Sequence, residues 1–105
     1  MAPPSATPLV HPAPTELTLE AVLHALSDPV RLQIVRALAA GQNERACGTF
    51  GLPVSKSTAS HHFKVLREAG VIAQEIRGRE RMITLRRDDL DARFPGLLGS
   101  VLAAL

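Results

Sequence analysis

The chain has 105 residues and a formal net charge of +2. Of its residues 46% are apolar and 3% are aromatic, and there is one cysteine. This size fits a single domain, the aliphatic composition favours packed helices over a β-sandwich, and one cysteine excludes an intramolecular disulfide framework. No apolar run reaches the roughly 20 residues of a membrane span and there is no secretory signal, so we expect a cytoplasmic protein without membrane contacts.

The N-terminal stretch is rich in proline: residues 1–14 contain five, separated by small and polar residues. Proline fixes φ and removes a backbone donor, so this composition resists both helix and sheet. We therefore predict a disordered arm over 1–14 and one folded domain over 15–105. His11 has no evident partner in such an arm, and the arm contains no Lys or Arg for contacting DNA.

Two helices are predicted next. Apolar residues recur at three- and four-residue steps over 15–26, where Thr15 or Thr18 can cap the helix. In the second helix Asp28 is a good N-cap and Pro29 suits the first turn, and apolar residues continue for about three turns. This second helix should lie in the core, with Arg31 and Arg36 on its exposed side.

The following residues are less regular. Residues 44–50 are expected to form a short third helix, and residues 51–54 a turn that leads into a further helix over 56–69. Two helices joined by a tight turn make a helix-turn-helix. Ser55 is a suitable N-cap for the second member and Gly70 a suitable left-handed C-terminal residue, so both of its ends are specified.

The helix over 56–69 has two different sides. An apolar stripe that must face a core consists of Ala59, His62 or Phe63, Leu66 and Ala69. The opposite side carries hydroxyls, an imidazole and cations, the groups that hydrogen-bond base edges and neutralise phosphates. Its members are Lys56, Ser57, Thr58, Ser60, His61, Lys64 and Arg67. The pattern favours a DNA-recognition helix, and an ordinary amphipathic surface helix is the alternative.

A β-hairpin is predicted after this helix, with strands over 71–77 and 81–85 around Gly78. Its tip would carry three arginines, Arg77, Arg79 and Arg81, and could lie on a DNA backbone or in a minor groove. Residues 55–87 as a whole contain eight Lys or Arg against three Glu, whereas the rest of the chain is net acidic. Such a basic block is typical of a nucleic-acid-binding face, although a solvated hairpin would look similar.

The C-terminal residues 88–105 are predicted to be helical, with an interruption near Pro95 and Gly96. The last segment is apolar for a terminus, with leucines and a valine at helical spacing. An exposed apolar stripe on so small a protein favours burial against a second copy, with the first helix as a matching surface. We expect a two-fold homodimer, unless both helices only cover their own core.

Two motifs carry a family resemblance: Ala25-Leu-Ser-Asp-Pro-Val-Arg-Leu32 and Ser57-Thr-Ala-Ser-His-His-Phe-Lys-Val-Leu-Arg-Glu-Ala-Gly-Val71. Together they resemble the ArsR/SmtB family of bacterial winged-helix repressors over residues 19–87. The resemblance implies a winged helix-turn-helix, mainly α with a small β-hairpin wing. It also implies a homodimer that binds a palindromic operator on double-stranded DNA and is released by an effector. By position, the implied DNA contacts are Lys56, Ser57, Thr58, Ser60, His61, Lys64, Arg77, Arg79 and Arg81.

The chain departs from the family at its metal sites. Where many members have a Cys-x-Cys pair this sequence has Glu44-Arg-Ala46, and Cys47 stands alone one position later. Residues 88–105 contain no histidine, and His61 and His62 point about 100° apart on a helix, so they cannot chelate one ion. We therefore expect no metal and no cofactor, and any small-molecule effector stays unidentified. His61 is interpreted as a DNA contact and His62 as packing or a local hydrogen bond.

Two other functions compete with a DNA-binding repressor. A metal- or redox-responsive sensor of the same fold could act through Cys47, and a protein-interaction module could use the winged helix and the apolar C-terminus to dock a partner. An enzyme is not expected, because the sequence has no Gly-rich phosphate loop, no metal-ligand cluster and no separated nucleophile and base.

Overall fold

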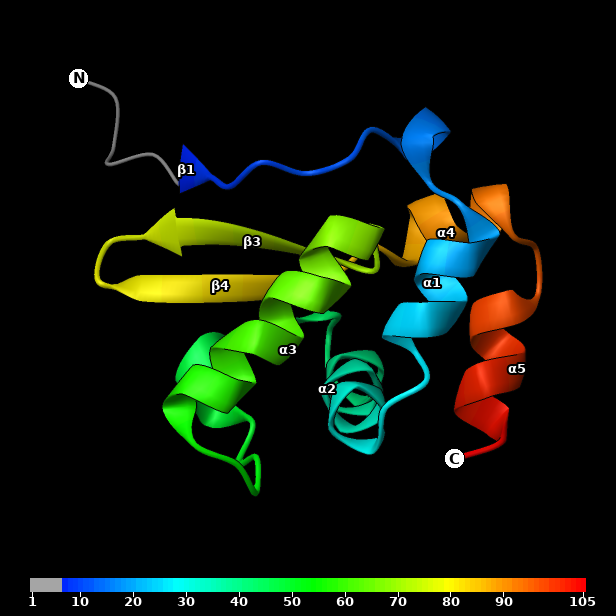
Figure 1. The fold of residues 1–105 in the computed structure, drawn as a ribbon. Helices are drawn as coiled ribbons and strands as arrows, with labels where there is room; N and C mark the ends of the chain where they lie inside the picture. Colours follow the sequence, from blue (N-terminus) through cyan, green and yellow to red (C-terminus); the bar gives the residue numbers. More distant parts are fainter. Residues whose placement is uncertain (1–6) are drawn as a thin grey trace.

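A computed structural model describes residues 7–105 (Figure 1). The helices are α1 (Leu19–Ala25), α2 (Pro29–Ala40), α3 (Lys56–Ala69), α4 (Arg87–Arg93) and α5 (Leu97–Ala103), with short 3-10 helices at Pro14–Glu16 and Cys47–Thr49. The strands are β1 (Thr7–Pro8), β2 (Glu44–Ala46), β3 (Ile72–Arg77) and β4 (Glu80–Leu85). The fold is the expected winged helix-turn-helix, mainly α with a β-hairpin wing. None of the helices within residues 7–105 is long and apolar enough to cross a membrane.

The wing is the antiparallel hairpin β3–β4, which projects to one side of the helices in Figure 1. Its pairing runs from Ile72 opposite Leu85 to Arg77 opposite Glu80, and Gly78 takes a φ of 64° in the turn between the strands. Such a left-handed φ favours glycine and allows a tight connection. The predicted hairpin is therefore confirmed, with its second strand beginning one residue earlier than expected.

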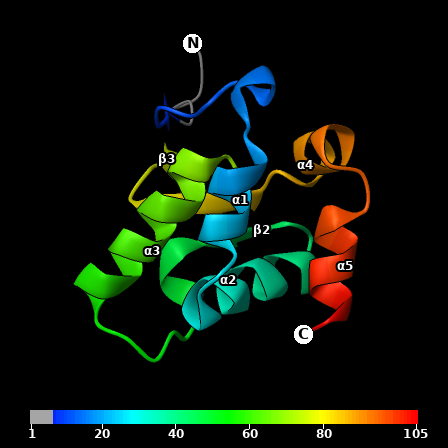
Figure 2. The same ribbon diagram turned by 45° about the vertical axis from the view of Figure 1, so that its right-hand side comes forward.

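The core lies between the helices and the inner face of the hairpin. Figure 2 shows α2 running below α1 toward α5, with α3 crossing beside them. The most completely buried large side chains are Leu17, Val22, Ile34, Val35, Leu38, Leu66, Val71, Ile72 and Ile83. The buried residues of α2 include Ile34, Val35 and Leu38, and those of α3 are His62, Phe63, Leu66 and Ala69. In both helices they recur at three- and four-residue steps, so each helix presents one stripe to the same core.

Side-chain caps define the helix ends. The hydroxyl of Thr18 accepts from the Ala21 N–H, and a carboxylate oxygen of Asp28 accepts from the N–H groups of Val30 and Arg31. Thr18, and not Thr15, is thus the cap of α1. Ser55 caps α3 through Thr58, and Gly70 ends it with a φ of 84°. The predicted start of α2 and both predicted ends of α3 are confirmed, and they could be predicted because these caps are local.

The predicted helix over 44–50 is wrong. Residues Glu44–Ala46 form strand β2, which pairs with β4 from Glu44 opposite Thr84 to Ala46 opposite Met82, and only Cys47–Thr49 form a 3-10 turn. The outer edge of β4 offers unpaired backbone groups, and satisfying them outweighs the weak helical preference of this short segment.

The predicted disordered arm also differs from the structure. Residues 1–6 lie outside the described part, but β1 pairs with β3, the Leu9 N–H donates to the Gln74 carbonyl (3.0 Å), and the Gln74 N–H donates to His11 Nε2 (2.8 Å). Arg86 also donates to the Pro12 carbonyl (2.9 Å). We call residues 7–12 the strap. Its prolines keep it extended, and an extended segment can pair with the free edge of β3.

Candidate nucleic-acid interface

One face of α3 is fully available to a ligand. All six of its predicted DNA-contact residues are exposed: Lys56, Ser57, Thr58, Ser60, His61 and Lys64. His62, Phe63, Leu66 and Ala69 are buried on the other face. At the N-terminal end the Ser55 cap also donates to the Thr58 hydroxyl (3.0 Å). The first turns of α3 therefore present hydroxyl groups beside the free backbone N–H groups of the helix N-terminus. Lysines lie at its start and further along the same face.

The wing tip lies near the N-terminal half of α3. Arg79 and Arg81 are exposed, and both line the same hollow of about 710 Å³ as Lys56 and Ser60. Two elements that are separate in the sequence thus form one cationic surface. A polyanion lying across it would meet charge from both elements.

Arg77 differs from its two neighbours at the tip. Its guanidinium donates to Glu44 of β2 (3.2 Å from Nη1 to Oε1) and to Glu75 of β3, and these hydrogen bonds, to Glu44 first, raise the pKa of Arg77. The positive charge of Arg77 is therefore balanced within the protein. The sequence did not indicate the carboxylates responsible, nor β2 itself.

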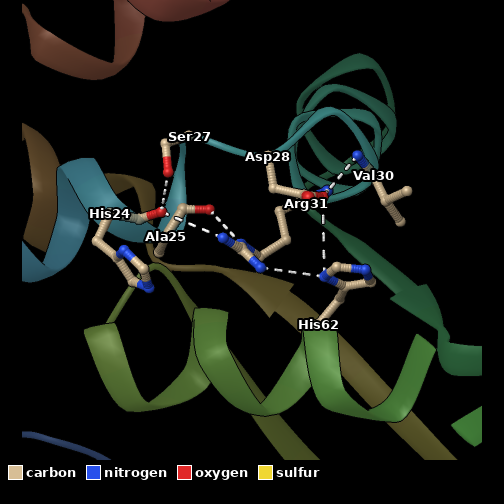
Figure 3. A network of polar contacts seen from close by, with 7 residues as sticks. All are labelled: His24, Ala25, Ser27, Asp28, Val30, Arg31 and His62. Carbon is tan, nitrogen blue, oxygen red and sulfur yellow. Dashed lines mark hydrogen bonds and ion pairs between the residues drawn. The ribbon is translucent and has the colours of Figure 1, made fainter. Parts of the chain in front are cut away.

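A buried polar network holds α3 against the other helices (Figure 3). Arg31 was expected on the exposed side of α2, but it is 8% exposed. Its Nε donates to the Ala25 carbonyl (2.7 Å), Nη2 to the His24 carbonyl (3.3 Å) and Nη1 to His62 Nδ1 (3.1 Å). A buried guanidinium needs acceptors for its donors, and two carbonyls at the end of α1 supply them for Nε and Nη2.

His62 is thus the α3 member of this network. Because arginine can only donate, the Nδ1 of His62 must accept, which places the proton of the neutral ring on Nε2. Asp28 Oδ2 lies 3.8 Å from the same nitrogen. Burial raises the pKa of the Asp28 carboxyl, but hydrogen bonds from the Arg31 and Val30 N–H groups, with the positive charge of the Arg31 side chain, outweigh burial and lower it.

Comparison with known proteins agrees with this geometry. A family profile described as a helix-turn-helix domain matches residues 26–75, which span α2 to β3. The uncharacterized HTH-type transcriptional regulator YceK of Bacillus subtilis (strain 168) is 42% identical over 79 residues, covering 73% of this chain and 79% of its own length. The chain belongs to the helix-turn-helix transcriptional regulators. Its function is DNA-binding transcription regulation.

In this regulator Cys47 lies in the wall of the hollow and is half-buried. Burial raises the pKa of its thiol, and the opposing effects of Arg81 and Lys56 are smaller. A raised pKa leaves less of the reactive thiolate at neutral pH. Within residues 7–105 no group of three His, Cys, Asp or Glu side chains could hold a metal ion.

Among the polar partners that were not predicted from the sequence, only Arg31 carried a local signal. Arg31 stands three, four and seven positions before Ile34, Val35 and Leu38, so it belongs to the buried stripe of α2. Glu44 carried no such signal, because its partner Arg77 lies 33 residues away in the chain.

Proposed function

We propose that this regulator is a homodimeric repressor of the ArsR/SmtB type that binds a palindromic operator with α3 in the major groove. The observation that carries the proposal is the single exposed surface formed by the N-terminal half of α3 and the wing tip, which share one hollow. The motifs at 25–32 and 57–71 support the family assignment.

The proposed contacts divide by chemistry. Lys56, Lys64, Arg79 and Arg81 are exposed cations suited to phosphates, and Ser57, Thr58, Ser60 and His61 can hydrogen-bond base edges. The 14 residues of α3 span about 21 Å, a length that fits the major groove. Arg77 would have to leave Glu44 and Glu75 to reach DNA, so we assign it a smaller contribution than Arg79.

The proposed dimer uses the opposite end of the molecule from the wing tip, where α1 and α5 lie in Figure 1. Leu19 and Leu23 of α1 are 45% and 46% exposed, and Leu105 after α5 is 42% exposed. Three large apolar side chains at one end favour burial against a second copy. Two copies would place their α3 helices on half-sites about one DNA turn apart, roughly 34 Å.

The first test is titration of the purified protein against DNA from upstream of its own gene, beside a scrambled duplex, at several salt concentrations. Selective binding that weakens steeply with salt would support an operator-binding regulator. No binding to either duplex at any salt would contradict it and favour a protein-interaction module.

Single substitutions then locate the surface. Lys56→Ala and Arg79→Ala, each alone, should weaken binding to the selected duplex, whereas Arg36→Ala, an exposed cation on α2, should not. For the dimer, Leu23→Asp should convert the protein to a monomer in light scattering coupled to gel filtration. Val10→Asp, at a side chain that is 92% exposed outside this end, is the control.

A further inference from the structure

The hollow between α3 and the wing contains more than the cations that DNA requires. It lies among the 3-10 turn Cys47–Thr49, the loop after it, the start of α3 and the tip of β4. Phe50 and Phe63 line it with their ring centroids 5.4 Å apart, and both are almost fully buried, so they form its floor. The half-buried side chains of Leu52, Val54 and Ala59 extend this apolar surface.

The same hollow is bordered by positive charge. Lys56, Arg79 and Arg81 line it against the single carboxylate of Glu80. None of these three cations forms an ion pair or a side-chain hydrogen bond with the described residues 7–105, in contrast to the paired Arg77. Their charge is therefore available to an anion.

An apolar floor beneath unpaired cations matches a ligand that has an anionic group at one end and an apolar body at the other. A phosphate backbone would use the cations but not the buried rings. Small-molecule sites are typically concavities of about 300–1,000 Å³, mostly apolar with a few polar groups that fix orientation, and this hollow of about 710 Å³ falls within that range. We propose that it binds a small amphiphilic anion, whose carboxylate lies at the cations and whose aliphatic or aromatic body lies on Phe50 and Phe63.

Such a ligand would also regulate the protein. The head group would lie at Lys56, Arg79 and Arg81. The proposed function assigns the same three cations to DNA phosphates, and this part of the inference rests on that assignment. Two anions cannot occupy the same cations, so the ligand and DNA exclude each other. The amphiphilic anion is then an inducer that acts by direct competition.

Cys47 makes the hollow measurable without DNA, because it is the one cysteine of the chain and lines the wall. The rate of Cys47 alkylation by iodoacetamide is measured with added decanoate, and with decanol as the uncharged ligand of equal chain length. Decanoate should slow alkylation at concentrations where decanol has little effect. Equal protection by both, or protection by neither, would overturn the proposal.

Substitutions test the two parts separately. Lys56→Gln and Arg81→Gln should each weaken protection by decanoate about two- to fivefold, the effect of one exposed unit charge in water. Ala59→Leu should fill the hollow and abolish protection, whereas Ala92→Leu, at an exposed alanine of α4, should leave it unchanged. Circular dichroism confirms folding, and the comparison of decanoate with decanol on the wild-type protein stands if Ala59→Leu does not fold. Full protection in the Gln variants would overturn the assignment of the head group.

Competition is read by adding decanoate or decanol to the protein bound to its selected duplex. Decanoate should release the DNA and decanol should not. Protection of Cys47 without release of DNA would overturn the shared use of the cations. Failure of the protein to bind any DNA would count against the proposed function alone, because the alkylation assay reports on the hollow independently.

Discussion

The two faces of α3 show how differently adjacent residues are constrained. His61 is exposed among the hydroxyls and lysines of the solvent-facing side, and His62 is buried against Arg31 with its Nδ1 as an acceptor. Their ring centroids are only 5.9 Å apart. The exposed face determines what the helix can bind, and the buried face determines where the helix is held. A substitution on one face should therefore affect binding, and on the other face stability.

The largest expected effect is on the buried face, at Leu66, which is 0% exposed. Leu66→Ala should reduce the free energy of unfolding by about 2–5 kcal/mol, because it leaves a cavity in the core. Lys64→Ala, two residues earlier on the exposed face, should change it by less than about 0.5 kcal/mol. Urea denaturation of both variants measures the difference, and similar losses would contradict the division of faces.

The next effect concerns the polar part of the buried face. Arg31→Met should destabilise the fold by about 2–4 kcal/mol, because the Ala25 carbonyl and His62 Nδ1 lose their donor, whereas the His24 carbonyl still accepts from Ser27. Arg36→Met, at an exposed arginine of the same helix, is the matched control. Urea denaturation compares the two, and equal midpoints would show that the network contributes nothing.

The acceptor role of His62 can be tested within the same network. Asparagine retains an acceptor near the position of Nδ1, whereas glutamine places its amide near Nε2. His62→Asn should therefore be more stable than His62→Gln in urea denaturation. The reverse order would indicate that Nδ1 does not accept from Arg31.

Substitutions on the exposed face should separate affinity from selectivity. Lys64→Ala should weaken binding to selected and scrambled duplexes alike and reduce the salt slope by about 1, as expected of a phosphate contact. His61→Ala should instead narrow the difference between the duplexes by about 1–3 kcal/mol, as expected of a base contact. Salt-dependent titrations of both variants measure this, and identical behaviour would remove the distinction between their roles.

The smallest effect is at the strap beside the C-terminal end of α3. Burial, followed by the charges of Arg86 and Arg67, lowers the pKa of His11 in the folded protein. The unfolded chain then binds the proton more readily, so the stability contributed by His11 is complete above its ordinary pKa of about 6.5 and falls as the pH decreases below it.

The matched variant for this effect is His11→Gln, which can still accept from the Gln74 N–H but does not titrate. The wild-type protein should lose more stability than His11→Gln between about pH 7.5 and 5.5, since residue 11 gains a proton on unfolding only in the wild type. Urea denaturation at both pH values measures this, and parallel losses would mean that His11 is not the titrating group.

Most of the fold could be predicted because its signals are local. The caps Asp28 and Ser55, the left-handed Gly70 and Gly78, and the alternation of apolar residues each act within one or two turns of chain. These signals define α2, α3 and the hairpin without help from residues far away in the sequence. All six predicted contacts of α3 lie on its exposed face, because a helix with one apolar stripe leaves the rest outside.

Other features of the protein were decided only by the tertiary structure, because they depend on partners that are distant in the sequence. Residues 44–46 became a strand because β4 presented an open edge, and the strap became ordered because β3 presented another. Arg31 could be buried because the end of α1 and His62 of α3 supplied acceptors. The positive charge of Arg77 is balanced by Glu44 of β2. Local periodicity and capping thus determine the elements, whereas hydrogen-bond acceptors, sheet edges and charges meet only when the chain has packed.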